Sequence, residues 1–169
     1  MTPQIIIEEK LEPVEGHESL VNYKFFVYSG VTKIVQVHSS ASGRGCVTFY
    51  NNEGKRLKIR KWVSEVEGAL PEIDTGLTLS GQFATMLDAA EQIGSGLDHV
   101  RVDLYEARNG IFLSELTCYD GSGYSYFFEE LEVYEVRPSE KLNLEYGGFW
   151  DLPEISLGKK VLRAMFSSL

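Results

Sequence analysis

Strand-like runs joined by very short turns limit most strongly how this chain can fold. Val21 to Ser29 and Thr32 to His38 are rich in aromatic and β-branched residues and flank Gly30, which predicts a hairpin. Cys46 to Tyr50 and Arg56 to Lys61 flank the turn sequence Asn-Asn-Glu-Gly and predict a second hairpin. Strands joined by such short turns run antiparallel.

The segment Leu77 to Ile93 has the spacing of an amphipathic helix. Its apolar residues recur three or four positions apart, and Gly94 follows it as a terminator. Val100 to Cys118 alternates again and predicts a third hairpin. Ile5 to Leu11 is expected to be a strand, and Ser156 to Phe166 a short terminal helix.

This order predicts the α+β fold class, with an antiparallel sheet and flanking helices. The 169 residues are the size of one domain, so we expect a single domain over residues 1–169. The formal net charge of −9 argues against a nucleic-acid partner. Two cysteines without a CxxC spacing, no basic leader and no long apolar run lead us to expect a cytoplasmic protein that uses no membrane.

Two carboxylates in the third hairpin need an explanation, because buried strands rarely carry them. If Asn109-Gly110 is a two-residue turn, Asp103 and Glu115 point to opposite faces. If Arg108-Asn109-Gly110 is a three-residue loop, the two residues lie opposite each other and Arg101 lies opposite Thr117. We expect the second register, because it keeps the apolar residues of both strands on one side.

Facing carboxylates repel each other unless a cation lies between them. Asp103, Glu115 and a hydroxyl such as that of Thr117 suit Mg²⁺, which prefers oxygen ligands, and Arg101 suits a phosphoryl group. The alternative is a salt-bridged surface hairpin in which Arg101 pairs diagonally with Glu115. Spacing alone leaves both interpretations open.

Other candidates carry weaker signals. Lys24 lies inside an aromatic strand and either reaches a phosphate or extends to solvent. Arg44 lies in a small-residue loop, where it either contacts phosphate or belongs to a plain turn. Cys118 is expected to be a buried thiol, and the three histidines show no metal-binding spacing.

The stretch RVDLYEARNGIFLSELTCYDGSG resembles the metal-binding hairpin of ATP-grasp enzymes, and its Glu-Leu-Thr and Gly-Ser-Gly elements are most similar to the TupA-like branch. The segments IIIEEKL, NYKFFVYSG and PSEKLNLEYGGFWDLP resemble other parts of that branch in the same order, although Asn22 stands where the branch has Asp. The resemblance implies the C-terminal half of the ATP-grasp fold.

The resemblance also implies the roles of particular residues. It makes Asp103, Glu115 and Thr117 ligands of Mg²⁺ and places Arg101 on the γ-phosphate. For ATP it implies that Glu8 meets the adenine amino group, that backbone at Glu9 and Leu11 meets the ring, and that Lys24 and Arg44 are candidates for the phosphates. Gly121, Ser122 and Gly123 would position the substrate or its oxyanion.

The resemblance implies an ATP-dependent carboxylate–amine ligation through an acyl phosphate, with a role in surface-polysaccharide synthesis. The chain as given starts at the segment that resembles the adenine hinge. We therefore expect the family's glycine-rich loop and its Lys to come from a longer gene or from another chain, or the protein to self-associate. The alternative is a non-catalytic interaction or structural module that keeps an ATP-grasp-like fold.

Overall fold

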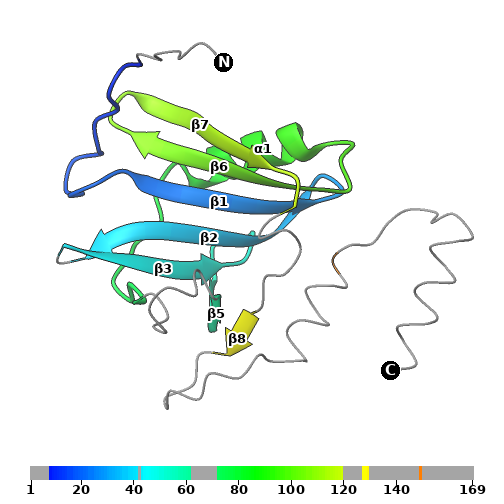
Figure 1. Ribbon diagram of the computed structural model, residues 1–169, viewed down its shortest axis with the longest axis horizontal. Helices are drawn as coiled ribbons and strands as arrows, with labels where there is room; N and C mark the ends of the chain where they lie inside the picture. Colours follow the sequence, from blue (N-terminus) through cyan, green and yellow to red (C-terminus); the bar gives the residue numbers. More distant parts are fainter. Residues whose placement is uncertain (1–7, 42, 62–71, 120–126, 130–148, 150–169) are drawn as a thin grey trace, which may run out of the picture.

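The computed structural model describes residues 8–41, 43–61, 72–119, 127–129 and 149. Their main element is a six-stranded sheet in the order β4-β3-β2-β1-β6-β7, with all neighbouring strands antiparallel. The strands are β1 (Val21–Tyr28), β2 (Val31–Ala41), β3 (Arg44–Tyr50), β4 (Arg56–Leu57), β6 (His99–Ala107) and β7 (Gly110–Thr117). The antiparallel sheet predicted from the short turns is confirmed (Figure 1).

The first predicted hairpin forms around a tight turn at Ser29 and Gly30. Both residues have positive φ, 49° and 78° respectively. Positive φ at both central positions matches the twist of the flanking strands, and Gly adopts it without a steric penalty. The turn therefore sets β1 and β2 in register, with Tyr28 opposite Val31.

The second predicted hairpin is shorter than expected. Only β4 pairs with β3, and the chain then continues into β5 (Ile59–Lys61), which pairs with β8 (Phe127–Glu129) in a separate two-stranded sheet. The alternating pattern of Arg56 to Lys61 did not predict this break between β4 and β5. Ile59 is buried beside Phe127 in an apolar cluster on one face of the main sheet, so burial against that face favours the separate pairing.

The helix α1 (Phe83–Gly94) covers the other face of the sheet, where it contacts β1, β2 and β6 (Figure 1). It begins six residues later than the predicted Leu77. Leu77 and Leu79 still pack against the core, but from a non-helical segment. The Ser80 hydroxyl accepts a hydrogen bond from the backbone N–H of Gln82, a local bond that favours a turn before the helix.

Residues 8–20 form no strand, so the predicted strand at Ile5 to Leu11 is wrong for residues 8–11; residues 5–7 lie outside the described residues. The segment instead runs beside the main sheet, and Glu12 accepts a backbone hydrogen bond from Arg108. The predicted helix at Ser156 to Phe166 also lies outside the described residues.

Alternation along the strands divides the core into two apolar clusters. The cluster under α1 includes alternate residues of β1 and β6, among them Phe25, Val27 and Val102. The cluster on the opposite face includes Phe26 and Tyr28, which alternate with them. The second face is apolar only toward one end of the strands, and its polar part forms the candidate site.

Gly94 provides a test of the packing between α1 and the sheet. A Cβ added at Gly94 would lie 2.5 Å from Val27 Cγ1 and 3.2 Å from Val100 Cγ1. We expect Gly94→Ala to lower the free energy of unfolding by about 1–3 kcal/mol, because the helix must move away from the sheet. Urea unfolding measures the change.

The matched control is Gly81→Ala, because nothing lies within 4 Å of its added Cβ. The pair Gly94→Ala and Val27→Ala should recover part of the lost stability, since the shortened side chain makes room. Equal stability of Gly94→Ala and wild type would contradict the described contact.

Tyr28 links stability to pH. Burial raises its pKa from about 10 to about 12. The protonated form is thus favoured in the folded state, so the contribution to stability is complete below pH 10 and is lost between pH 10 and 12. When the pH is raised from 8 to 11, the free energy of unfolding of Tyr28→Phe should fall by about 1 kcal/mol less than that of wild type. Urea unfolding at the two pH values measures both changes. Identical losses would show that the hydroxyl is not buried.

Candidate functional site

Polar side chains form ordered rows across the second face of the sheet. One row runs across β2, β1, β6 and β7 and places Gln36, Lys24, Asp103 and Glu115 at consecutive paired positions. Paired residues on one face of a sheet have Cβ atoms about 5 Å apart. Residues far apart in the sequence therefore meet because of the strand register.

The neighbouring rows complete the face. Toward the start of β1, the paired positions hold His38, Asn22, Tyr105 and Phe112. On the other side, Arg101 lies opposite both Phe26 and Thr117. The polar side chains thus extend over four strands and border the apolar cluster at Phe26.

The register predicted for the carboxylate hairpin is confirmed, but the predicted loop is wrong. Asp103 lies opposite Glu115, while Ala107 pairs with Gly110 around a two-residue turn. A bulge at Ser114 provides the one-residue shift that the sequence interpretation had assigned to a three-residue loop. Gly110 has a positive φ of 145°, which Gly adopts without a steric penalty.

Asp103 is at the centre of a network of charges. Its side chain is 1% exposed. Arg101 donates from Nε to Asp103 Oδ1 at 2.7 Å and from Nη2 to Oδ2 at 2.9 Å, and Lys24 donates to the same Oδ2. Two cations therefore neutralise one buried carboxylate, and this explains why a carboxylate is tolerated there.

Glu115 extends the network toward solvent. Arg101 Nη2 lies 3.1 Å from Glu115 Oε2, and the Thr117 hydroxyl donates to Oε1 at 2.9 Å. The diagonal pairing of Arg101 with Glu115, which was the alternative interpretation, is thus present. Because Glu115 is 57% exposed, its oxygens are accessible from solvent. We call Lys24, Arg101, Asp103, Glu115 and Thr117 the charged cluster.

The oxygens of the charged cluster suit a metal shared with a ligand better than a metal held by protein alone. Asp103, Glu115 and Thr117 offer carboxylate and hydroxyl oxygens on adjacent positions, which Mg²⁺ prefers. Within the described residues, no three His, Cys, Asp or Glu side chains are arranged to hold an ion. Mg²⁺ commonly binds through one or two carboxylates together with substrate phosphates, so the residues fit that kind of site.

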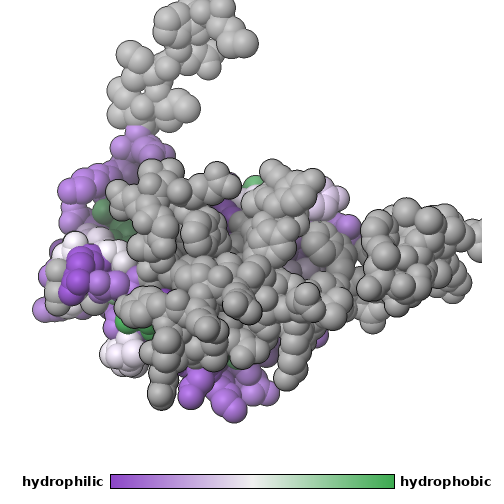
Figure 2. Space-filling model, turned by 60° about the horizontal axis from the view of Figure 1, so that its bottom comes forward, coloured by the Kyte–Doolittle hydropathy of each residue, from purple (hydrophilic) through white to green (hydrophobic). Residues whose placement is uncertain are grey.

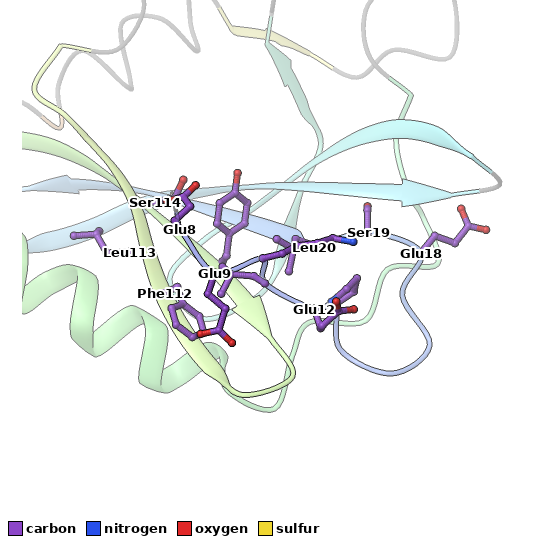
Figure 3. A pocket seen from close by; sticks show the side chains of 13 residues that line it. Glu8, Glu9, Glu12, Glu18, Ser19, Leu20, Phe112, Leu113 and Ser114 are labelled. Atoms are coloured by element: carbon purple, nitrogen blue, oxygen red, sulfur yellow. The ribbon is translucent and has the colours of Figure 1, made fainter. Parts of the chain in front are cut away.

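A groove of about 1040 Å³ adjoins the charged cluster. Segment 8–20 forms one wall, and the ends of β6 and β7 form the other, with Tyr105 and Phe112 among the lining residues (Figure 3). Glu8, Glu9 and Leu11, for which the family resemblance implies contacts with adenine, all line it. The residues next to the N-terminal tail are coloured hydrophilic in the space-filling view (Figure 2).

The groove and the charged cluster lie near each other along β6, although no residue of the charged cluster lines the groove. Tyr105 lines the groove, and Asp103 is two residues away on the same face. Two strand residues span about 7 Å. A ligand with an aromatic group in the groove would therefore have its next atoms at Lys24 and Arg101.

The structure does not bring all predicted residues together. Arg44 lies at the start of β3, where it is exposed and forms an ion pair with Glu72 at 2.6 Å; alternation places it on the face opposite Lys24. Gly121, Ser122 and Gly123 lie outside the described residues. Cys118 is exposed, so the predicted buried thiol is wrong.

Sequence reasoning missed Gln36 and His38. Both occur at alternate positions of a run that was interpreted only as a strand, and alternation predicts that they share one face. Their proximity to Lys24 depends on the pairing of β1 with β2, in which a one-residue register shift between Phe26 and Val27 places Gln36 opposite Lys24. Polar residues at alternate positions of an otherwise apolar strand were the available signal.

Removing Asp103 tests the network. Asp103→Ala leaves Lys24 and Arg101, which are 16% and 12% exposed, without their shared partner. We expect it to lower the free energy of unfolding by about 3–5 kcal/mol. Glu115→Ala, at an exposed position, should cost less than about 1 kcal/mol. Similar losses in the two variants, measured by urea unfolding, would contradict the central role of Asp103.

Comparison with known proteins gives one match. A family model described as TupA-like ATPgrasp matches residues 1–133, which is more than half of the 169 residues. Searches of curated proteins and of solved structures return no match. Among the described residues, no helix combines the length and the apolar composition needed to cross a membrane.

Proposed function

The chain belongs to the TupA-like ATP-grasp family, and from this premise we propose that it binds ATP and Mg²⁺ as part of an ATP-dependent carboxylate–amine ligase. The proposed role is in surface-polysaccharide synthesis in the cytoplasm. The proposed substrates are a small or sugar-linked carboxylate and an amine. The observation that carries the proposal is the position of the groove next to the charged cluster, with Tyr105 and Asp103 two residues apart on β6.

The groove suits the nucleoside part of ATP. Tyr105 and Phe112 provide aromatic surface on one wall, and the segment containing Glu8, Glu9 and Leu11 provides carboxylates and exposed backbone on the other. A carboxylate is an acceptor for the exocyclic amino group of adenine. This arrangement supports the roles that the family resemblance implies for these residues.

The charged cluster suits the phosphates and the metal. Lys24 and Arg101 supply donors that match phosphate oxygens, and Asp103, Glu115 and Thr117 supply oxygens for Mg²⁺. Without a ligand the two cations and the two carboxylates neutralise each other. ATP with Mg²⁺ carries negative charge on the phosphates and positive charge on the metal. The two cations of the cluster can therefore exchange a carboxylate for a phosphate, and the two carboxylates can exchange a cationic side chain for Mg²⁺.

In the proposed reaction, the carboxylate substrate attacks the γ-phosphate of ATP and the amine then displaces phosphate from the acyl phosphate. When bound, Mg²⁺ would neutralise charge on the phosphates. Lys24 and Arg101 would hold phosphate oxygens, and the groove would fix the base. The proposal includes a partner chain, or a second copy of this chain, that covers the phosphates.

Calorimetric titration with ATP and Mg²⁺ tests the proposal. We expect saturable binding that Glu115→Gln weakens at least tenfold, because a neutral amide is a poor ligand for Mg²⁺. Glu115 is preferred over Asp103 for this test, because its side chain is exposed and the fold depends on it less.

The matched control is Asp88→Asn, which makes the same change of charge at an exposed position of α1, on the opposite side of the sheet. It should bind as wild type does. No saturable binding by the chain, or equal weakening in the two variants, would refute the proposal.

The second candidate function is a non-catalytic module. The observation that favours it is the internal neutralisation of Asp103, both of whose oxygens already accept from cations. The same titration separates the two functions, because the module predicts no binding of Mg²⁺ and ATP at concentrations where a ligase is saturated.

A further inference from the structure

Three polar residues of β1 and β2 share the face of the charged cluster but have no role in the proposed nucleotide site. Asn22 lies opposite His38, and Gln36 lies opposite Lys24. We call Asn22, Gln36 and His38 the amide–imidazole cluster. Lys24 pairs with Gln36 on one side and with Asp103 on the other. This cluster and the carboxylate oxygens proposed for Mg²⁺ therefore lie on opposite sides of Lys24.

Gln36 and His38 hold each other in place. Gln36 is 4% exposed, and its Nε2 lies 2.6 Å from His38 Nε2. The two side chains are therefore in hydrogen-bond contact, and this contact fixes the side of the cluster formed by β2.

Asn22 lacks such a partner. Its Oδ1 is buried and makes no hydrogen bond within the described residues. A buried amide oxygen is normally paired, because it has given up its bonds to water. Asn22 also lies opposite Tyr105, which lines the groove, so this acceptor lies next to the site proposed for the nucleoside.

We propose that the amide–imidazole cluster binds the amine substrate, with Asn22 Oδ1 accepting a hydrogen bond from the amine N–H. This inference rests on the proposed ligase function. Glu8, Glu9, Glu12 and Glu18 outnumber Lys10 on the neighbouring groove, so the surface near this cluster attracts an ammonium ion. Next to Asn22, the positive charge of Lys24 favours the neutral amine, which is the nucleophilic form.

The position is consistent with the chemistry of the second step. The amine nitrogen forms a bond to the acyl carbon while the bond from that carbon to the phosphate oxygen breaks. The electron pair leaves with the phosphate, which also takes the proton that the nitrogen loses. Lys24, which lies between Gln36 and Asp103, is placed to hold that phosphate next to the amine.

Nuclear magnetic resonance on the ¹⁵N-labelled chain tests the inference, with Mg²⁺ and a non-hydrolysable ATP analogue present. Glycinamide serves as the amine probe and sodium acetate as the carboxylate probe. We expect glycinamide to shift the side-chain amide signals of Asn22 and Gln36 in a saturable manner. Asn22→Ala should weaken glycinamide binding at least fivefold, followed through Gln36, whereas Asn52→Ala, in an exposed turn, should not.

Three results would overturn the inference. In the first, acetate shifts the amide signals in a saturable manner and glycinamide does not. In the second, neither probe gives a saturable shift. In the third, Asn22→Ala binds glycinamide as tightly as wild type does. Calorimetry of Mg²⁺ and ATP on the same proteins separates the two proposals. Nucleotide binding with unresponsive amide signals refutes only the amine subsite, whereas absence of nucleotide binding refutes the proposed function itself.

Discussion

The buried carboxylate of Asp103, shared by Lys24 and Arg101, is the interaction on which the polar face of the sheet depends. It joins β1 to β6 at the centre of a sheet whose opposite face is covered by α1. A carboxylate in this position without two cations would be strongly unfavourable. The same bonds hold both cations on the face that adjoins the groove, so stability and the proposed binding of phosphate use the same side chains.

Local sequence signals predicted the elements that depend on local interactions. The Ser29-Gly30 turn, the strands around it and the amphipathic part of α1 followed from turn chemistry and periodicity. The start of α1 was placed too early, because Leu77 and Leu79 are apolar yet pack from a non-helical segment. The separate β5–β8 pair depends on burial next to Phe127, far away in the sequence, and periodicity carries no information about that contact.

The candidate site was predicted in part, and for a reason that was partly wrong. Asp103 and Glu115 do face each other, but a bulge at Ser114 causes the shift, and no turn residue marks it. The pairing of Lys24 with Asp103 depends on β1 lying next to β6 in the sheet. This is a non-local contact, which alternation within single strands does not predict. Membership of the TupA-like ATP-grasp family gives this arrangement a functional interpretation that its ion pairs alone do not provide.

We propose that phosphates and metal meet at the charged cluster and not in the acidic groove. Mn²⁺ can replace Mg²⁺ and broadens the resonance signals of nearby nuclei, so adding Mn²⁺ and ATP to the ¹⁵N-labelled chain locates the ion directly. We expect the backbone amide signals of Asp103, Glu115 and Thr117 to broaden first, while those of α1 stay sharp. Broadening centred on Glu8 to Glu18, or spread evenly over the chain, would contradict it.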